Sequence, residues 1–128
     1  LICVCLRAAQ VFQVSSRRTM WLTILALLVL VNSVVGIFSY IEVIAPVLMG
    51  LPFHHCLYCM VQNVGDGSIM LGLFVLGNMM IGAALPSWKL AMSWADEKSL
   101  VRLITRLLNL GAICLAGPLL MLLVHLVR

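Results

Sequence analysis

The stretch MWLTILALLVLVNSVVGIFSYI, residues 20–41, decides the fold class of this chain. It carries no charged side chain, and about 20 mostly apolar residues are enough to cross a bilayer as a helix. Trp21 and Tyr40 lie near its two ends, where aromatic residues gather at membrane–water interfaces. We therefore expect a transmembrane helix over residues 20–41.

The composition of the whole chain agrees with this expectation. Of its 128 residues 64% are hydrophobic and 9% are charged, with a mean hydropathy of +1.19. Soluble domains carry about 25% charged residues, so a soluble globular domain is excluded. The formal net charge of +4 does not indicate a nucleic-acid partner, because the basic residues lie beside apolar runs and form no patch with aromatic residues. The expected partner is the lipid bilayer.

Two further stretches predict membrane spans. Residues 68–86 form the second, closed by Pro86 and Trp88, and residues 107–127 form the third, with Pro118 as an expected kink. Residues 1–14 are apolar without the features of a signal peptide, and we interpret them as the end of a longer apolar segment. The prediction is one all-α membrane domain, a bundle of three transmembrane helices to which residues 1–14 would add a partial fourth.

The distribution of basic residues predicts the orientation. The connection over residues 42–67 contains no Lys or Arg, and cytoplasmic connections are enriched in both. This connection is therefore expected on the outer face, periplasmic or extracytoplasmic. Arg128, at the outer end of the third span, is the exception. The basic residues that flank the spans on the expected cytoplasmic side are Arg17, Arg18, Lys89, Lys98, Arg102 and Arg106.

The outer connection contains GLPFHHCLYCMVQNVGDG, residues 50–67. Pro52 suits the first turn of a helix and no breaker follows until Gly65, so we expect a short outer-face helix that leads into the second span. At 100° per residue, one side of this helix would be polar and should face a cavity, water or a protein. That side collects His55, Cys56, Cys59, Met60, Gln62, Asn63 and Asp66, and the opposite side collects Phe53, Leu57, Val61 and Val64.

Cys56 and Cys59 are the candidate catalytic residues. At spacing i, i+3 on a helix their sulfur atoms can meet, and a first-turn position stabilises a thiolate. A disulfide between them would fit an oxidising outer compartment. The alternative is that both are small buried residues without chemistry.

A soft-metal site is the second interpretation of the same segment. Its candidate ligands are His54, His55, Cys56, Cys59 and, from the outer end of the third span, His125. Asp66, Asn63 and Met60 would surround the ligands, the first two orienting an imidazole. A covalent c-type haem is disfavoured because Met60 follows Cys59 where that motif has His, and a zinc finger because no second pair has ligand spacing.

The Cys56-Leu-Tyr-Cys59 motif, at the expected outer mouth of a helix, resembles the membrane disulfide oxidoreductases, namely the vitamin K epoxide reductase and disulfide-generating quinone-reductase families. The resemblance implies disulfide chemistry beside a quinone. It covers only these few residues. Those families also use a second outer cysteine pair, which this sequence lacks, so we infer no membership.

Two classes of function therefore stay open. The first is an outer-face His/Cys-x-x-Cys site for thiol redox chemistry or for binding a soft transition metal, with haem or quinone as further candidate cofactors. The second is a non-catalytic accessory subunit of a larger membrane complex for electron transfer or transport, in which small residues pack helices together. Gly72, Gly77, Gly82, Ala112 and Ala116 are the small residues that either internal packing or subunit docking would use. Whether the protein is an enzyme is left open.

Overall fold

The computed structural model describes residues 2, 18–50, 53, 55–91, 94 and 96–127, and the described part is helical without strands. Three helical stretches are long and apolar enough to cross a membrane: Thr19–Met49, Gly65–Ala91 and Glu97–Val127. The prediction of an all-α membrane bundle with three spans is thus confirmed. The predicted partial span over residues 1–14 lies outside the described residues, apart from Ile2.

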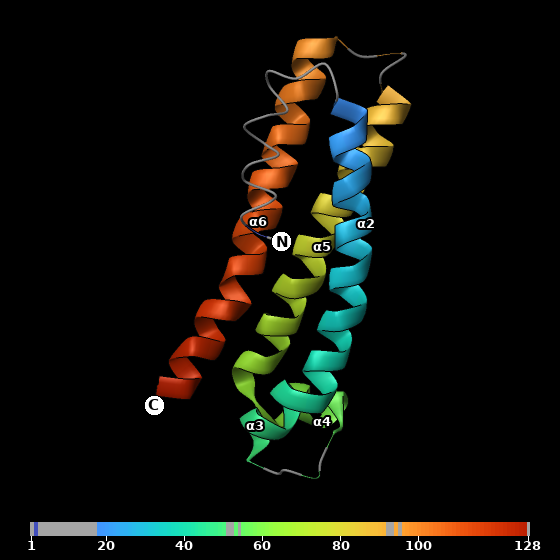
Figure 1. The fold of residues 1–128 in the computed structure, drawn as a ribbon. Coiled ribbons are helices and arrows are strands. Elements are labelled where there is room, and N and C mark those ends of the chain that lie inside the picture. Colours follow the sequence, from blue (N-terminus) through green and yellow to red (C-terminus); the bar gives the residue numbers. More distant parts are fainter. Residues whose placement is uncertain are drawn as a thin grey trace.

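The elements follow one another as a bundle with two short helices at one end (Figure 1). They are α2 (Arg18–Ser39), the π-helix η1 (Tyr40–Ile44), α3 (Ala45–Met49), α4 (Leu57–Asn63), α5 (Gly65–Ala91) and α6 (Glu97–Val127). Helix α5 lies between α2 and α6 and packs against both. Helices α3 and α4 lie beside the start of α5.

The first span is longer than residues 20–41. The chain stays helical beyond Glu42 through η1 and α3 and ends at Gly50, whose φ of 63° and ψ of 20° are left-handed. Glycine adopts this conformation without steric cost, which is why the helix ends there. Glu42 therefore projects from a helical turn rather than from a loop.

Helices α5 and α6 approach each other closely through two glycines. A Cβ on Gly77 would lie 3.0 Å from the Gly111 carbonyl oxygen, and a Cβ on Gly111 would lie 2.6 Å from Cγ1 of Ile81. Gly77 and Ala112 are thus used for internal packing, whereas Gly72 has nothing within 4 Å of its Cβ position. The buried core around this contact comprises Leu22, Leu25, Val29, Ile81, Ala84, Trp88, Leu100, Ile104, Leu108, Ala112 and Leu115.

A smaller buried cluster joins the short helices to the bundle. It consists of Tyr40, Ala45 and Met60, which are at most 3% exposed. The Tyr40 hydroxyl donates a hydrogen bond to the Met70 carbonyl at 3.2 Å, and its ring packs on Phe74 with 5.4 Å between centroids. These contacts join the end of the first span to α4 and to the first half of α5.

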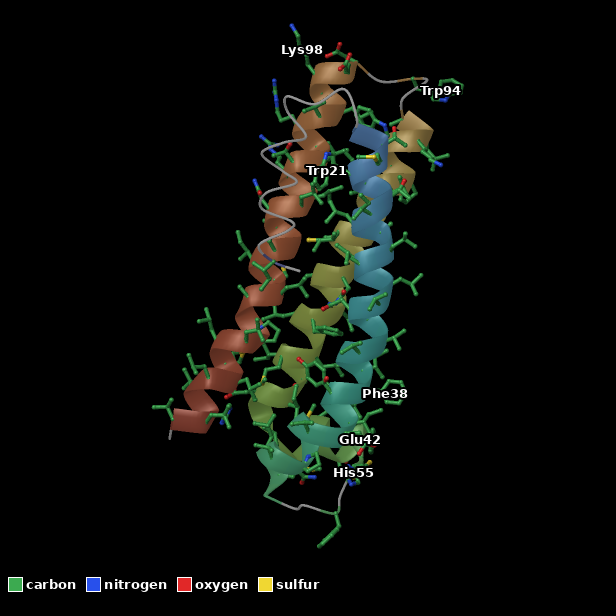
Figure 2. All side chains as sticks on the ribbon, viewed as in Figure 1. Trp21, Phe38, Glu42, His55, Trp94 and Lys98 are labelled. Atoms are coloured by element: carbon green, nitrogen blue, oxygen red, sulfur yellow. The ribbon has the colours of Figure 1, made fainter. Side chains whose placement is uncertain are left out.

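Basic side chains of α6 and the His55–Glu42 contact lie at opposite ends of the bundle axis. Figure 2 shows Trp94 and Lys98 at one end, and Glu42 and His55 at the other. The basic residues Lys98, Arg102 and Arg106 all belong to the first turns of α6, near the α5–α6 connection. The cysteine-bearing segment is at the opposite end of the bundle, as the sequence predicts.

Candidate functional site

Cys56 begins helix α4. Its backbone is extended, with φ −90° and ψ 107°, and its Sγ accepts a hydrogen bond from the Cys59 N–H at 3.4 Å. The thiol thereby caps one of the amide groups that a helix start leaves unpaired. The helix consequently starts at Leu57 and not at Pro52: Phe53 lies in a turn, and Pro52 is outside the described residues.

The two thiols differ in acidity. The Cys59 thiol hydrogen-bonds to the Cys56 sulfur, and this contact, together with backbone N–H groups of Cys59 and Tyr58, holds the pKa of Cys56 below its usual value. The same contact raises the pKa of Cys59, because it favours the protonated Cys59 thiol, and partial burial adds to the rise. Both cysteines are free thiols and both are half-buried. The Cys56 thiol is therefore the more acidic of the pair.

His55 turns back toward the end of the first span. Its Nδ1 lies 3.3 Å from the Ile41 carbonyl oxygen and 3.5 Å from Oε2 of Glu42. Figure 2 shows the His55 and Glu42 side chains beside each other at this end of the bundle. The imidazole that precedes Cys56 is thus held by the first span, and not by Asn63 or Asp66.

His125 contacts a different part of the chain from His55. Its Nε2 is 3.3 Å from Oδ2 of Asp66, which joins the last turn of α6 to the first turn of α5. The two side chains line a cavity of about 340 Å³ together with Leu120, Met121 and Val124. Asp66 therefore orients His125, while Glu42 takes the place beside His55 that the sequence alone assigns to Asp66 or Asn63.

The other predicted site residues are dispersed. Asn63 donates a hydrogen bond to the Cys59 carbonyl at 2.9 Å, so it supports the helix end. Met60 is fully buried in the cluster with Tyr40 and faces away from water. His54 lies outside the described residues. Within the described residues, no group of three or more His, Cys, Asp or Glu side chains lies close enough together to hold a metal ion.

Sequence reasoning missed Glu42 and the Ile41 carbonyl. The signal that could have found them is Pro46. A proline lacks an N–H and crowds the carbonyl four residues before it, so a helical turn ahead of Pro46 has to widen and lose a hydrogen bond. The π-helix at Tyr40–Ile44 is this widened turn, and such turns are common at functional sites.

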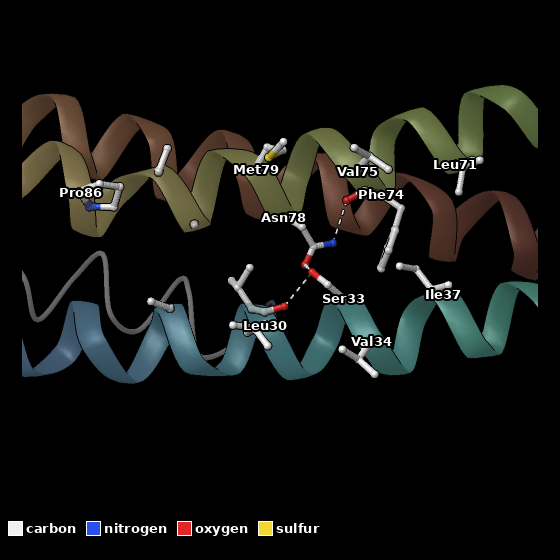
Figure 3. Close-up of a pocket in the computed structure, with 14 residues that line it drawn as sticks. Leu30, Ser33, Val34, Ile37, Leu71, Phe74, Val75, Asn78, Met79 and Pro86 are labelled. Carbon is white, nitrogen blue, oxygen red and sulfur yellow. Dashed lines mark hydrogen bonds between the residues drawn. The ribbon is translucent and has the colours of Figure 1, made fainter.

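A second feature lies in the middle of the bundle. Asn78 is 7% exposed and accepts hydrogen bonds from Asn32 at 2.9 Å and from Ser33 at 3.4 Å, which links α5 to α2. Along this link the two helices form an apolar groove of about 680 Å³, with Ser33 and Asn78 in its lining (Figure 3). The groove is lined by Ala26, Val29, Leu30, Ser33, Val34, Ile37, Leu71, Phe74, Val75, Asn78, Met79, Gly82, Ala83 and Pro86.

Fold and site together define a helical membrane protein with a Cys-x-x-Cys pair at one end of its bundle. The chain matches no protein-family model, no curated protein and no solved structure. Its function therefore has to be argued from the geometry of its own residues.

Proposed function

We propose that Cys56 and Cys59 perform thiol–disulfide exchange on the outer face of the membrane. The observation that carries the proposal is the hydrogen-bonded thiol pair, in which the pKa of Cys56 is lowered and that of Cys59 is raised. Thiolates attack disulfides, so a thiol that ionises readily and stays half-exposed is the expected nucleophile. The second thiol is in place to release the substrate.

The exchange proceeds in two steps. The Cys56 thiolate attacks one sulfur of a substrate disulfide; the substrate S–S bond breaks, a mixed disulfide forms, and the first substrate thiolate leaves and takes up a proton. Cys59 then loses its proton and attacks the Cys56 sulfur. The mixed disulfide breaks, the Cys56–Cys59 disulfide forms, and the second substrate thiolate leaves. The cysteine pair gives up two electrons and the substrate disulfide gains them.

The test uses purified protein in lipid nanodiscs, with Cys3, Cys5 and Cys114 changed to serine so that only the pair remains. The probe is 5,5′-dithiobis(2-nitrobenzoate), a charged aromatic disulfide. The intact pair should release two thiolates per chain and end as an internal disulfide. Cys59→Ser should release one and retain the adduct, and Cys56→Ser should react slowly. Equal behaviour of both serine variants and the parent contradicts the proposal.

The acidity of Cys56 gives the same experiment a second measurement. Because the Cys59 thiol contact is the first cause of the lowered pKa, Cys59→Ala should move the pH midpoint of Cys56 alkylation upward. Cys59→Ser keeps a hydroxyl donor and should move it less. An unchanged midpoint in Cys59→Ala means that the contact does not activate Cys56.

The orientation can be tested on intact cells with the same membrane-impermeant probe. We expect it to reach the pair from outside, because the basic residues cluster at the other end of the bundle. Reaction only in inverted vesicles would place the pair on the cytoplasmic face.

The other interpretations give different results in the nanodisc preparation. A soft-metal site should retain metal in stoichiometric amount and lose it in Cys56→Ser and Cys59→Ser alike. Such a site would need ligands beyond those the described residues bring together, for example His54. An accessory subunit should show no exchange, and it should unfold or be lost from cells when its partner subunits are absent.

A further inference from the structure

A cavity beside the last turns of α6 takes no part in the proposed exchange. Helices α5 and α6 stay in contact as far as Gly117, where an added Cβ would lie 2.9 Å from the Leu73 side chain. The cavity of about 340 Å³ follows further along α6. The ends of α5 and α6 that line it lie at the same end of the bundle as α3 and α4 (Figure 1). Its lining residues are Asp66, Leu120, Met121, Val124 and His125.

Asp66 brings into this cavity a carboxylate that can accept a further hydrogen bond. Its Oδ2 lies 3.3 Å from Nε2 of His125, and Oδ1 has no hydrogen-bond or ion-pair partner among the described residues. An ionised carboxylate accepts hydrogen bonds through both oxygens. Residues 42–67 contain no Lys or Arg, and the basic residues in the first turns of α6 lie at the opposite end of the bundle. A cationic ligand could therefore take the free oxygen.

The other walls of the cavity suit a hydrocarbon chain. Leu120 and Val124 are 63% and 53% exposed on α6, which is long and apolar enough to cross a membrane. Side chains of this kind on a membrane span face the acyl chains of lipids. Because Asp66 and His125 belong to the ends of two spans, the cavity joins the acyl layer to the headgroup layer. A ligand that fits both parts has a cationic head and an apolar tail.

We propose that this cavity binds the headgroup of a membrane lipid that carries a primary ammonium, such as phosphatidylethanolamine. The ammonium donates a hydrogen bond to Oδ1 of Asp66, His125 holds the carboxylate through Oδ2, and an acyl chain lies along Leu120 and Val124. A volume of 340 Å³ lies in the range of small-ligand sites, about 300–1,000 Å³. A quaternary ammonium has no N–H to donate, so phosphatidylcholine should bind less tightly. The proposal is independent of the exchange function.

The test is native mass spectrometry of the purified protein in detergent, titrated with the dioctanoyl forms of the two lipids. The difference between them is one charge-assisted hydrogen bond at a partly exposed carboxylate. We therefore expect the parent to bind phosphatidylethanolamine about five- to tenfold more tightly than phosphatidylcholine. Asp66→Asn keeps the shape of the side chain, removes its charge and should bring the two dissociation constants together.

Glu42→Gln is the matched control. It neutralises a carboxylate at the same end of the bundle that contacts His55 and does not line the cavity, so the preference should persist. His125→Lys keeps Asp66 and places an ammonium of the protein beside it. This variant should lose the preference by competition, whereas His125→Gln keeps a hydrogen-bond donor and should retain it.

Each outcome decides the assignment. Equal affinities for the two lipids in the parent, or a preference that survives in both Asp66→Asn and His125→Lys, overturn the proposal. A preference lost equally in Glu42→Gln also overturns it, because the carboxylates would then act only as general surface charge. Ethanolamine and octylamine are added as competitors to identify the source of the ammonium. If ethanolamine displaces the lipid at equal concentration, the site takes a free amine and the lipid assignment is overturned.

Discussion

The middle of the bundle and the end that carries the cysteines are held together by different means. In the middle, Gly77 and Gly111 let the backbones of α5 and α6 approach each other closely. The buried core around this contact contains no charged side chain. At the cysteine end, His55 and Glu42 are 43% and 62% exposed and meet through hydrogen bonds. The middle thus depends mainly on close packing, with one hydrogen-bonded link at Asn78, whereas the end adds to its buried cluster around Tyr40 a contact that water can reach.

Under the proposed exchange function, this difference separates stability from chemistry. A membrane bundle gains stability where small residues let helices approach closely. Thiol exchange needs water to carry protons and needs access for a substrate. The two demands are met in separate parts of the chain, so changes in the middle should alter stability and leave the reactivity of Cys56 unaffected. Changes at the end should do the reverse.

The largest effect on stability is expected for Gly111→Ala. The new methyl group would lie 2.6 Å from Cγ1 of Ile81, which is 1% exposed, and 3.1 Å from the Gly77 carbonyl oxygen. Neither neighbour can move away freely, and overpacking of this kind costs about 1–3 kcal/mol. The measurement is the free energy of unfolding in bicelles titrated with SDS.

Gly72→Ala is the matched control for this substitution. The same change is made on α5, at an exposed glycine with nothing within 4 Å of its Cβ position. Alanine is a better helix former than glycine by about 1 kcal/mol, so Gly72→Ala should be neutral or stabilising. If both variants lose the same stability, the α5–α6 contact is not what holds the middle together.

A smaller effect is expected for the hydrogen bond between Asn32 and Asn78. Such bonds between membrane helices contribute about 0.6 kcal/mol on average and at most about 1.7 kcal/mol. A double-mutant cycle with Asn32→Leu and Asn78→Leu should give a coupling energy in this range. Additive effects of the two substitutions would show that the bond does not link α2 to α5.

The sequence predicts the middle better than the end, for a physical reason. Membrane spans follow from the length and polarity of apolar runs. The fold class and the three membrane helices could therefore be predicted from residues 20–41, 68–86 and 107–127. The cysteine pair could also be found, because its i, i+3 spacing is local. The partners of the histidines could not, because they depend on which distant turn each ring reaches. His55 meets Glu42 and His125 meets Asp66, at separations of 13 and 59 residues along the chain.

The start of α4 shows the same limit on a smaller scale. Pro52 favours a helix start, yet the helix begins at Leu57 after Cys56. The Cys56 sulfur accepts a hydrogen bond from the Cys59 N–H and so caps a helix that starts at Leu57. The His55 ring contacts the Ile41 carbonyl of the first span. The helix start therefore depends on two contacts, one within the segment and one to the Ile41 carbonyl of the first span.

The smallest effect is expected for the contact between Asp66 and His125, which is an ion pair when His125 is protonated. Their side chains are 55% and 33% exposed, and exposed pairs contribute about 0.2–1 kcal/mol because water and salt screen them. Asp66→Asn keeps an acceptor for the ring and removes only the charge. The loss of unfolding free energy should therefore stay below about 1 kcal/mol and shrink as salt is raised, since the screening length falls with ionic strength. Thiol exchange should be unaffected, because the pair does not contact Cys56 or Cys59. A loss as large as that of Gly111→Ala, independent of salt, would mean that the end of the bundle is held as tightly as its middle, and the contrast between the two regions would fail.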